Sequence, residues 1–389
     1  MKAFHQLSTF QKIISEFKND EPLSRFLGLH YRQNKQMGSR DRRMASRLVY
    51  NYFRLGNALG DIDLVERLAV AEFLCNDISN SFLEYYQPEW NNQVELSLAE
   101  KLALVKEKYA QFDLKDVFPF NEHFSEGIDQ EAYLLSFFTQ PDLFIRVKAT
   151  EEQKIKKLLA SADIKFEAKG NQTIALSNGT KLEQIITDSS SYEIQDWSSQ
   201  KVGQFFEPKK WEKWWDCCAA SGGKTLLLHA LQPDLKLLVT DNRESILENL
   251  QQRFALAGIR SYQKKVFDLT LSQDLFLHDY EFDGIIFDAP CSGSGTWGRT
   301  PEMIAQFANH KIKFYTELQK KIANNVVKYL KPEKPLIYIT CSVFKEENED
   351  QVKWLCDTFN LEIEKQELIK GYEVKADTMF VARLIKGVG

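Results

Sequence analysis

The chain has 389 residues, of which 43% are hydrophobic, and a formal net charge of −5. This length predicts two or three globular domains. No apolar run is long enough to span a bilayer and the first residues lack a signal-peptide core, so we expect a cytoplasmic protein without membrane contact. The six cysteines include no C-x-x-C pair, which favours free thiols and gives no reason to expect a metal site.

The charge is unevenly distributed along the chain. Residues 1–56 contain 11 Lys and Arg against 4 Asp and Glu, a balance of +7, so the remainder carries −12 to give the total of −5. A basic end on an acidic protein is typical of a phosphate-binding surface. A solvated helical surface explains the same charge equally well.

The first region, residues 1–112, is predicted to be a helical domain because apolar residues recur at spacings of three and four. Its clearest helix covers residues 40–55, with Ser39 as the expected N-cap. Two stripes of side chains run along this helix: an apolar stripe of Met44, Leu48, Tyr52 and Leu55, and an arginine stripe of Arg40, Arg43, Arg47 and Arg54.

The second region, residues 113–210, is predicted to be a small α/β domain. Residues 143–147 and 173–176 have the apolar, β-branched character of strands, and residues 151–162 that of a helix.

The third region, residues 211–389, alternates strands with helices, which predicts a mostly parallel sheet covered on both faces. The expected strands are 214–216, 235–240, 265–267, 284–288, 336–340 and 378–384, the last at an edge of the sheet. The expected helices are 224–231, 243–257, 314–330 and 346–359.

The first strand of this sheet runs into a glycine-containing turn, D-C-C-A-A-S-G-G-K-T, at residues 216–225. Small residues let a backbone turn tightly and approach a ligand at the start of a helix. The segment is not a phosphate loop, because Cys218 stands where that motif needs its first glycine, and it lacks the G-x-G-x-x-G of a dinucleotide fold. Taken alone, it could be an ordinary strand-to-helix turn.

Two aspartates follow the next strands. Asp241 ends the second strand, where an acidic residue can accept hydrogen bonds from both hydroxyls of a ribose. Asp268 follows the third strand and could meet the amino edge of an adenine. A single aspartate in such a loop is usually a turn residue, but acids after successive strands favour a nucleoside site.

Two further strands end in cysteines, in the segments D-A-P-C-S-G-S-G from Asp288 and T-C-S from Thr340. Attack of a thiolate on carbon 6 of a pyrimidine makes carbon 5 nucleophilic enough to accept a methyl group from a sulfonium donor. That chemistry needs a thiolate, a carboxyl group at the N3 edge and a second acid–base group. Cys341, Asp288 and Cys291 can supply them, although a free cysteine often merely packs.

These segments resemble the signature motifs of the Sun (Fmu) family of RNA cytosine-C5 methyltransferases, and the resemblance covers about residues 190–389. It implies a Rossmann-like methyltransferase domain with a seven-stranded sheet. It also implies that S-adenosylmethionine is the cofactor, bound by Cys218, Ala219, Ala220, Ser221, Gly222, Gly223, Lys224, Asp241, Asp268 and Asp288. Ser221 stands where the family usually has proline.

The resemblance also implies the roles of individual side chains. Cys341 is similar to the nucleophile of the family, Cys291 to the cysteine that assists product release, and Asp288 to the acid that contacts the cytosine. Arg299 lies in an R-x-P sequence like the one in the family, which implies a contact with RNA.

The N-terminal region resembles, over one helix, the NusB-like RNA-binding domain of ribosomal-RNA members. This implies RNA contacts by Arg40, Arg43 and Arg47 and favours ribosomal RNA over transfer RNA as the substrate of a monomeric enzyme. Two other readings remain: a ribosome-assembly factor that only holds RNA, and a small-molecule methyltransferase. Neither accounts for the paired cysteines.

Overall fold

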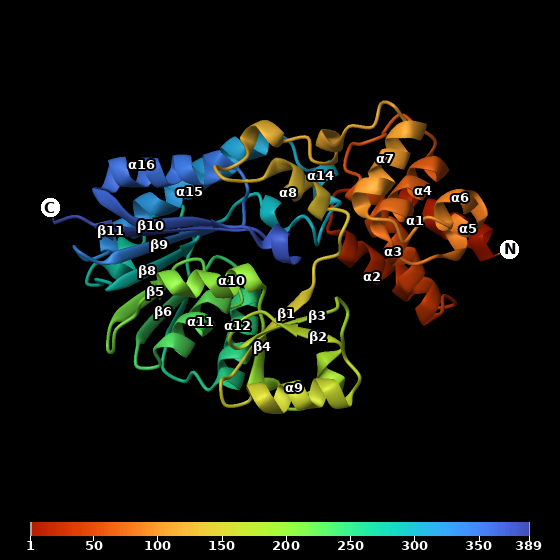
Figure 1. Cartoon of the computed structure of the whole chain (residues 1–389). Coiled ribbons are helices and arrows are strands. Elements are labelled where there is room, and N and C mark those ends of the chain that lie inside the picture. Colours follow the sequence, from red (N-terminus) through yellow and green to blue (C-terminus); the bar gives the residue numbers. More distant parts are fainter. Residues whose placement is uncertain (1, 389) are drawn as a thin grey trace. The chain divides into compact units, whose positions relative to one another are not determined.

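The structure is a computed structural model, and it describes residues 2–388 (Figure 1). These residues form two compact units. Unit 1 comprises residues 2–122, 129–140 and 296–308, and unit 2 comprises residues 123–128, 141–295 and 309–388. The division into three domains at residues 112 and 210 stays a prediction.

Unit 1 is helical. Its α-helices are α1 (Lys2–Glu16), α2 (Leu23–Gln33), α3 (Ser39–Arg54), α4 (Leu64–Cys75), α5 (Ser81–Tyr86), α6 (Pro88–Asn91), α7 (Leu98–Lys108), α8 (Gln130–Ser136) and α14 (Met303–Gln306). Side-chain caps begin several of them: Asp63 accepts from the first turn of α4, and Ser97 and Glu100 form a capping box on α7.

The helix expected at 40–55 is α3, but two details of the prediction are wrong. The extended Gly38 takes the N-cap position and Ser39 is already helical, without a side-chain cap bond. The arginine stripe also does not continue to Arg54, whose side chain is buried and donates to the carbonyls of Phe137 and Thr139. A guanidinium is tolerated there because these acceptors replace water.

Unit 2 contains a small antiparallel sheet in the order β2-β3-β1-β4, with α9 (Glu152–Ser161) in the same segment. The strands are β1 (Leu143–Val147), β2 (Phe166–Ala168), β3 (Thr173–Leu176) and β4 (Tyr192–Ile194). The two expected strands are confirmed with the same bounds.

The larger sheet of unit 2 has seven strands in the order β10-β11-β9-β8-β5-β6-β7. They are β5 (Lys213–Asp216), β6 (Lys236–Asp241), β7 (Gln263–Val266), β8 (Gly284–Asp288), β9 (Pro335–Thr340), β10 (Leu361–Ile369) and β11 (Met379–Lys386). Neighbours pair in parallel except around β11, which is antiparallel to β9 and β10. The predicted Rossmann-like fold is confirmed, whereas the edge position expected for 378–384 is wrong because β10 lies outside β11.

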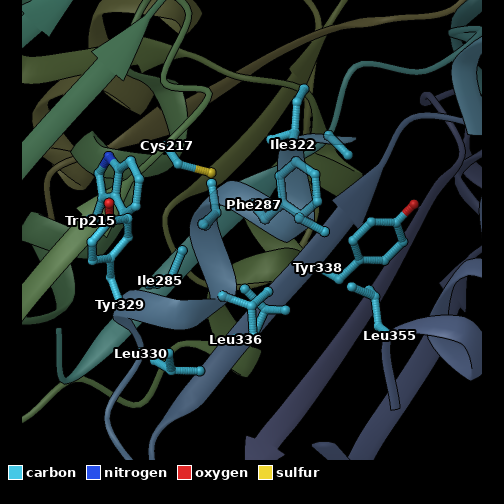
Figure 2. Packing of buried hydrophobic residues seen from close by; sticks show 14 of the residues in the cluster. Trp215, Cys217, Ile285, Phe287, Ile322, Tyr329, Leu330, Leu336, Tyr338 and Leu355 are labelled. Carbon is cyan, nitrogen blue, oxygen red and sulfur yellow. The ribbon is translucent and has the colours of Figure 1, made fainter. Parts of the chain in front are cut away.

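The central strands are buried on both faces, so successive residues enter two different cores. Trp215, Phe287 and Tyr338 pack on the face covered by α15 (His310–Val326) and α16 (Glu349–Phe359), as Figure 2 shows for part of this cluster. Trp214 and Ile286 pack on the face covered by α11 (Gly223–Leu231) and α12 (Glu244–Ala257) (Figure 1). The short helices α10 (Trp197–Lys201) and α13 (Asp274–Leu277) complete this unit.

Candidate active site

A cavity of about 540 Å³ lies at the carboxyl ends of the parallel strands of the large sheet, where ligands bind in open α/β folds. Residues from the ends of five strands and from α15 line it: Cys217, Cys218, Ala220, Asp241, Asn242, Arg243, Phe267, Asp268, Leu269, Thr270, Asp288, Ala289, Pro290, Cys291, Tyr315, Leu318, Ile322 and Cys341. Of the residues that the sequence analysis singled out, Asp241, Asp268, Asp288, Cys291 and Cys341 line this cavity.

The two cysteines of the predicted chemistry meet on the wall of this cavity. Cys291 follows β8 and Cys341 follows β9, and their Sγ atoms are 3.4 Å apart. The loops that carry them are also joined by a hydrogen bond from the Gly295 amide to the Cys341 carbonyl at 2.9 Å. Both thiols are free and half-buried, so both can contact a ligand.

The two thiols differ in their electrostatics. The hydrogen bond with Cys341, followed by burial, raises the pKa of Cys291 well above its ordinary value. A thiol with a raised pKa holds its proton more tightly, which suits an acid–base group beside a nucleophilic Cys341. In the adjacent pair after β5, Cys217 is buried in the core and only Cys218 is partly exposed.

Asp288 is held by a cation from the glycine-containing turn at residues 216–225, which we call the cofactor turn. The Lys224 Nζ donates to Asp288 Oδ2 at 3.0 Å, and the lysine is buried. Burial alone would lower the pKa of Lys224, but the charge and hydrogen bond of Asp288 outweigh it and the pKa is raised. Lys224 thus fixes one carboxylate oxygen and leaves the other available to a ligand.

A buried acid that sequence reasoning missed lies behind the cysteines. Glu347 has no exposed surface, and its carboxylate accepts from the Ser292 amide at 2.8 Å and from the Ser292 hydroxyl at 2.6 Å. The Ser292, Ser294 and Ser342 hydroxyls lie 3.1–3.2 Å from one another. Glu347 and the three serines therefore join the two cysteine loops. In the sequence, Glu347 is one of four clustered acids, and nothing distinguishes it from a helix-start residue.

Burial raises the pKa of Glu347 to about 7, against the lowering effect of hydrogen bonds from Ser292 and Ser342. Because the folded-state pKa is the higher one, the stability contribution is largest below pH 4.5 and is lost as the pH rises to about 7. We expect the free energy of unfolding of the wild type, relative to Glu347→Gln, to fall by about 3 kcal/mol over this range. Urea unfolding at several pH values measures it, and a pH-independent difference would contradict the assignment.

The cofactor turn between β5 and α11 is shaped by Gly222, whose φ is +83°. A Cβ at this position would lie 2.6 Å from the Phe254 ring. Beneath the turn, the Thr225 hydroxyl donates to Asp216 at 2.6 Å and so ties its two ends together. Burial raises the pKa of Asp216 to about 7. The two residues act on the turn from below and do not line the cavity.

Gly222→Val should destabilise this unit strongly. The substitution combines a left-handed backbone with a clash against Phe254, so we expect the free energy of unfolding to drop by about 3 kcal/mol in urea titrations. Gly223→Ala is the matched control, because a Cβ there meets nothing within 4 Å. Equal losses in both variants would show that the turn tolerates a side chain at Gly222.

Ser221, which stands at the usual proline position, is fixed by a neighbouring helix. Arg253 of α12 donates to both the carbonyl and the hydroxyl of Ser221 at 2.9 Å. The other arm of the guanidinium donates to Glu193 of β4 at 2.9 Å. The contact thus supplies the restraint that a proline ring would give the turn, and it connects the turn to the small sheet.

Asp241 closes β6 and is engaged on both oxygens. It accepts from the Ala220 amide at 3.0 Å and from the amide and side chain of Arg243 at 2.9–3.2 Å. The side chain of Arg243 is 57% exposed and free to rotate away. Asp268 accepts from the amide and hydroxyl of Thr270 through Oδ1, so its Oδ2 can face a ligand.

The other predicted site residues are more dispersed. Ala219, Ser221, Gly222, Gly223 and Lys224 shape or flank the turn without lining the cavity. Of the N-terminal arginines, Arg40 and Arg43 are exposed, whereas Arg47 pairs with the buried Glu72 at 2.9 Å. Arg299 belongs to unit 1 and is half-buried. RNA contacts by these four arginines stay predictions.

Residues 2–388 contain no group of three or more His, Cys, Asp or Glu side chains that could hold a metal ion. No helix in this part of the chain is long and apolar enough to cross a membrane.

The seven-stranded sheet with its cavity at the strand ends is a Rossmann-like arrangement. Residues 203–385 match the model of the family described as 16S rRNA methyltransferase RsmB/F.

Curated proteins and a solved structure are also similar to this chain. The chain is 34% identical over 159 residues to ribosomal RNA small subunit methyltransferase B of Shewanella oneidensis, which covers 41% of this chain and 37% of the relative. It is 34% identical over 186 residues to human tRNA (cytosine(72)-C(5))-methyltransferase NSUN6, which covers 45% and 39%. This chain thus spans less than half the length of either relative.

A methyltransferase homologue from Pyrococcus horikoshii has the same fold, with a TM-score of 0.55, 23% identity and coverage of 66% of this chain and 90% of that one.

Proposed function

We propose that the chain is an S-adenosylmethionine-dependent RNA cytosine-C5 methyltransferase that forms 5-methylcytosine through a covalent Cys341 adduct. The observation that carries the proposal is the 3.4 Å contact between Cys291 and Cys341 in a cavity shared with Asp288. Two thiols and a carboxyl group at adjoining strand ends are the set that this chemistry needs. The proposed substrate is ribosomal RNA, which the enzyme modifies in the cytoplasm as a monomer.

The residues of the cavity fit S-adenosylmethionine. A volume of about 540 Å³ lies in the range of small-molecule sites. All four acceptor positions of the Asp241 carboxylate are occupied, so ribose hydroxyls bind there once the exposed Arg243 side chain moves away. Asp268, Cys218 and Ala220, which also line the cavity, would complete the nucleoside site. The cofactor supplies an electrophilic methyl group.

The protein groups then act in order on a cytosine inserted beside the cysteines. Asp288, fixed by Lys224, holds the N3 edge of the base. The Cys341 thiolate adds to carbon 6, which makes carbon 5 nucleophilic. After methyl transfer, a base takes the carbon-5 proton with the assistance of Cys291, the double bond between carbons 5 and 6 forms again, and Cys341 leaves as a thiolate to release the product.

The test is incubation of the purified chain with methyl-labelled S-adenosylmethionine and total cellular RNA, followed by nucleoside analysis. We expect label in 5-methylcytosine and most of it in ribosomal RNA. Label in the 5-methylcytosine of transfer RNA would support the proposed reaction but would show that transfer RNA, and not ribosomal RNA, is the substrate. RNA binding without any labelled cytosine would support an assembly factor and contradict the proposal.

A further inference from the structure

A second hollow, of about 390 Å³, lies along α15 outside the cofactor cavity. Its most exposed large apolar side chain is Phe314, which is 61% exposed. Phe314, Leu318 and Lys321 follow the spacing i, i+4 and i+7 and so lie on one face of the helix, and all three line the hollow. A single exposed aromatic residue is ordinary, so a binding role for Phe314 has to be argued from the side chains around it.

Those surroundings are basic. Lys313 and Lys321 line the hollow and are exposed. The acid on this face, Glu317, pairs with Lys320 at 3.0 Å, so cations remain in excess. An aromatic ring between lysines is the arrangement that binds single-stranded nucleic acid: the ring stacks on a base and the cations contact phosphates.

The hollow adjoins the catalytic cavity. Leu318 and Thr270 line both spaces. Tyr315, the next residue after Phe314, lines the cavity that contains the cysteines. The two rings pack edge to face, with their centroids 5.3 Å apart. A strand with one base in the cavity therefore has a neighbouring nucleotide within reach of Phe314.

We propose that this face of α15 binds the nucleotide next to the target cytosine, with Phe314 stacked on its base and Lys313 and Lys321 on its phosphates. The proposal rests on the proposed function for the presence of RNA. It gives the chain a subsite that selects single-stranded RNA, because a base within a duplex cannot stack on a protein ring.

The experiment measures binding of a short single-stranded oligoribonucleotide with one cytosine, without turnover. Phe314→Ala should weaken binding by about tenfold to a hundredfold, and Phe314→Tyr, which keeps the stacking ring, should restore it. The matched control is Trp211→Ala, which removes another aromatic residue, 68% exposed, from the loop before β5. Lys313→Gln and Lys321→Gln should each reduce, by about one, the slope of the logarithm of the binding constant against the logarithm of the salt concentration.

Two further measurements separate this inference from the proposed function. S-adenosylmethionine affinity should be equal in wild type and Phe314→Ala, which shows an intact fold. In the methylation assay, Phe314→Ala should raise KM for RNA more than it lowers kcat. Methylation by the wild type together with unchanged RNA affinity in Phe314→Ala would overturn the subsite alone. That result would make the exposed ring a surface for a protein partner.

Discussion

Cys341→Ala should lower the rate of cytosine methylation by about four orders of magnitude, because no other group in the cavity replaces a thiolate that adds to carbon 6. The side chain lies at the end of β9, on the cavity wall and 3.4 Å from Cys291. Cys291 can reach a base in the same cavity, but its raised pKa makes it a poor substitute. Single-turnover assays with saturating RNA measure this loss.

Cys356→Ala is the matched control for this variant. Cys356 is also a free, partly buried cysteine, but it lies in α16 and packs against the hydrophobic cluster of Figure 2. We expect it to retain activity. Methylation by Cys341→Ala at the wild-type rate would remove the nucleophile assignment and, with it, the adduct mechanism.

Cys291→Ala should trap the enzyme on its substrate. Once carbon 5 is methylated, the adduct breaks down only after its carbon-5 proton is removed, and loss of a positioned acid–base group slows such a step by about a hundredfold to ten-thousandfold. A covalent protein–RNA complex should therefore accumulate and survive denaturing electrophoresis. The 3.4 Å contact of the two sulfurs places Cys291 next to the bond that must break.

The double variant gives the control for this trap. Cys291→Ala combined with Cys341→Ala should form no covalent complex, because the sulfur that joins the RNA is missing. Accumulation of the complex in Cys341→Ala, and its absence from Cys291→Ala, would exchange the roles of the two cysteines.

Most of the large sheet was predictable because its central strands are buried on both faces. Continuous apolar runs such as Gly284–Asp288 and Pro335–Thr340 can then be recognised without knowledge of their partners. β10 was missed because most of its residues are exposed and four of its nine are charged. Since β10 forms the edge, its omission also displaced β11 in the predicted order.

The candidate site also contains residues that the sequence pattern predicts and residues that it does not. Cys291, Cys341 and Asp288 follow strand ends, and the topology of a parallel sheet brings such ends together. Glu347 and Arg253 act through long-range contacts with Ser292 and Ser221, which no local pattern encodes. The sequence also did not predict that Thr296–Ala308 belongs to unit 1, because a segment that leaves one unit for another has no characteristic spacing of apolar residues.

Arg253 also couples the small sheet energetically to the cofactor turn. Its guanidinium is bonded to Ser221 of the turn and to Glu193 of β4, so neither element shifts without loss of a charge-assisted bond that contributes about 1.5–3 kcal/mol. A ligand that rearranged β4 would therefore change the affinity of the turn for its own ligand. By reciprocity, occupancy of the turn would change the affinity of the small sheet by the same factor.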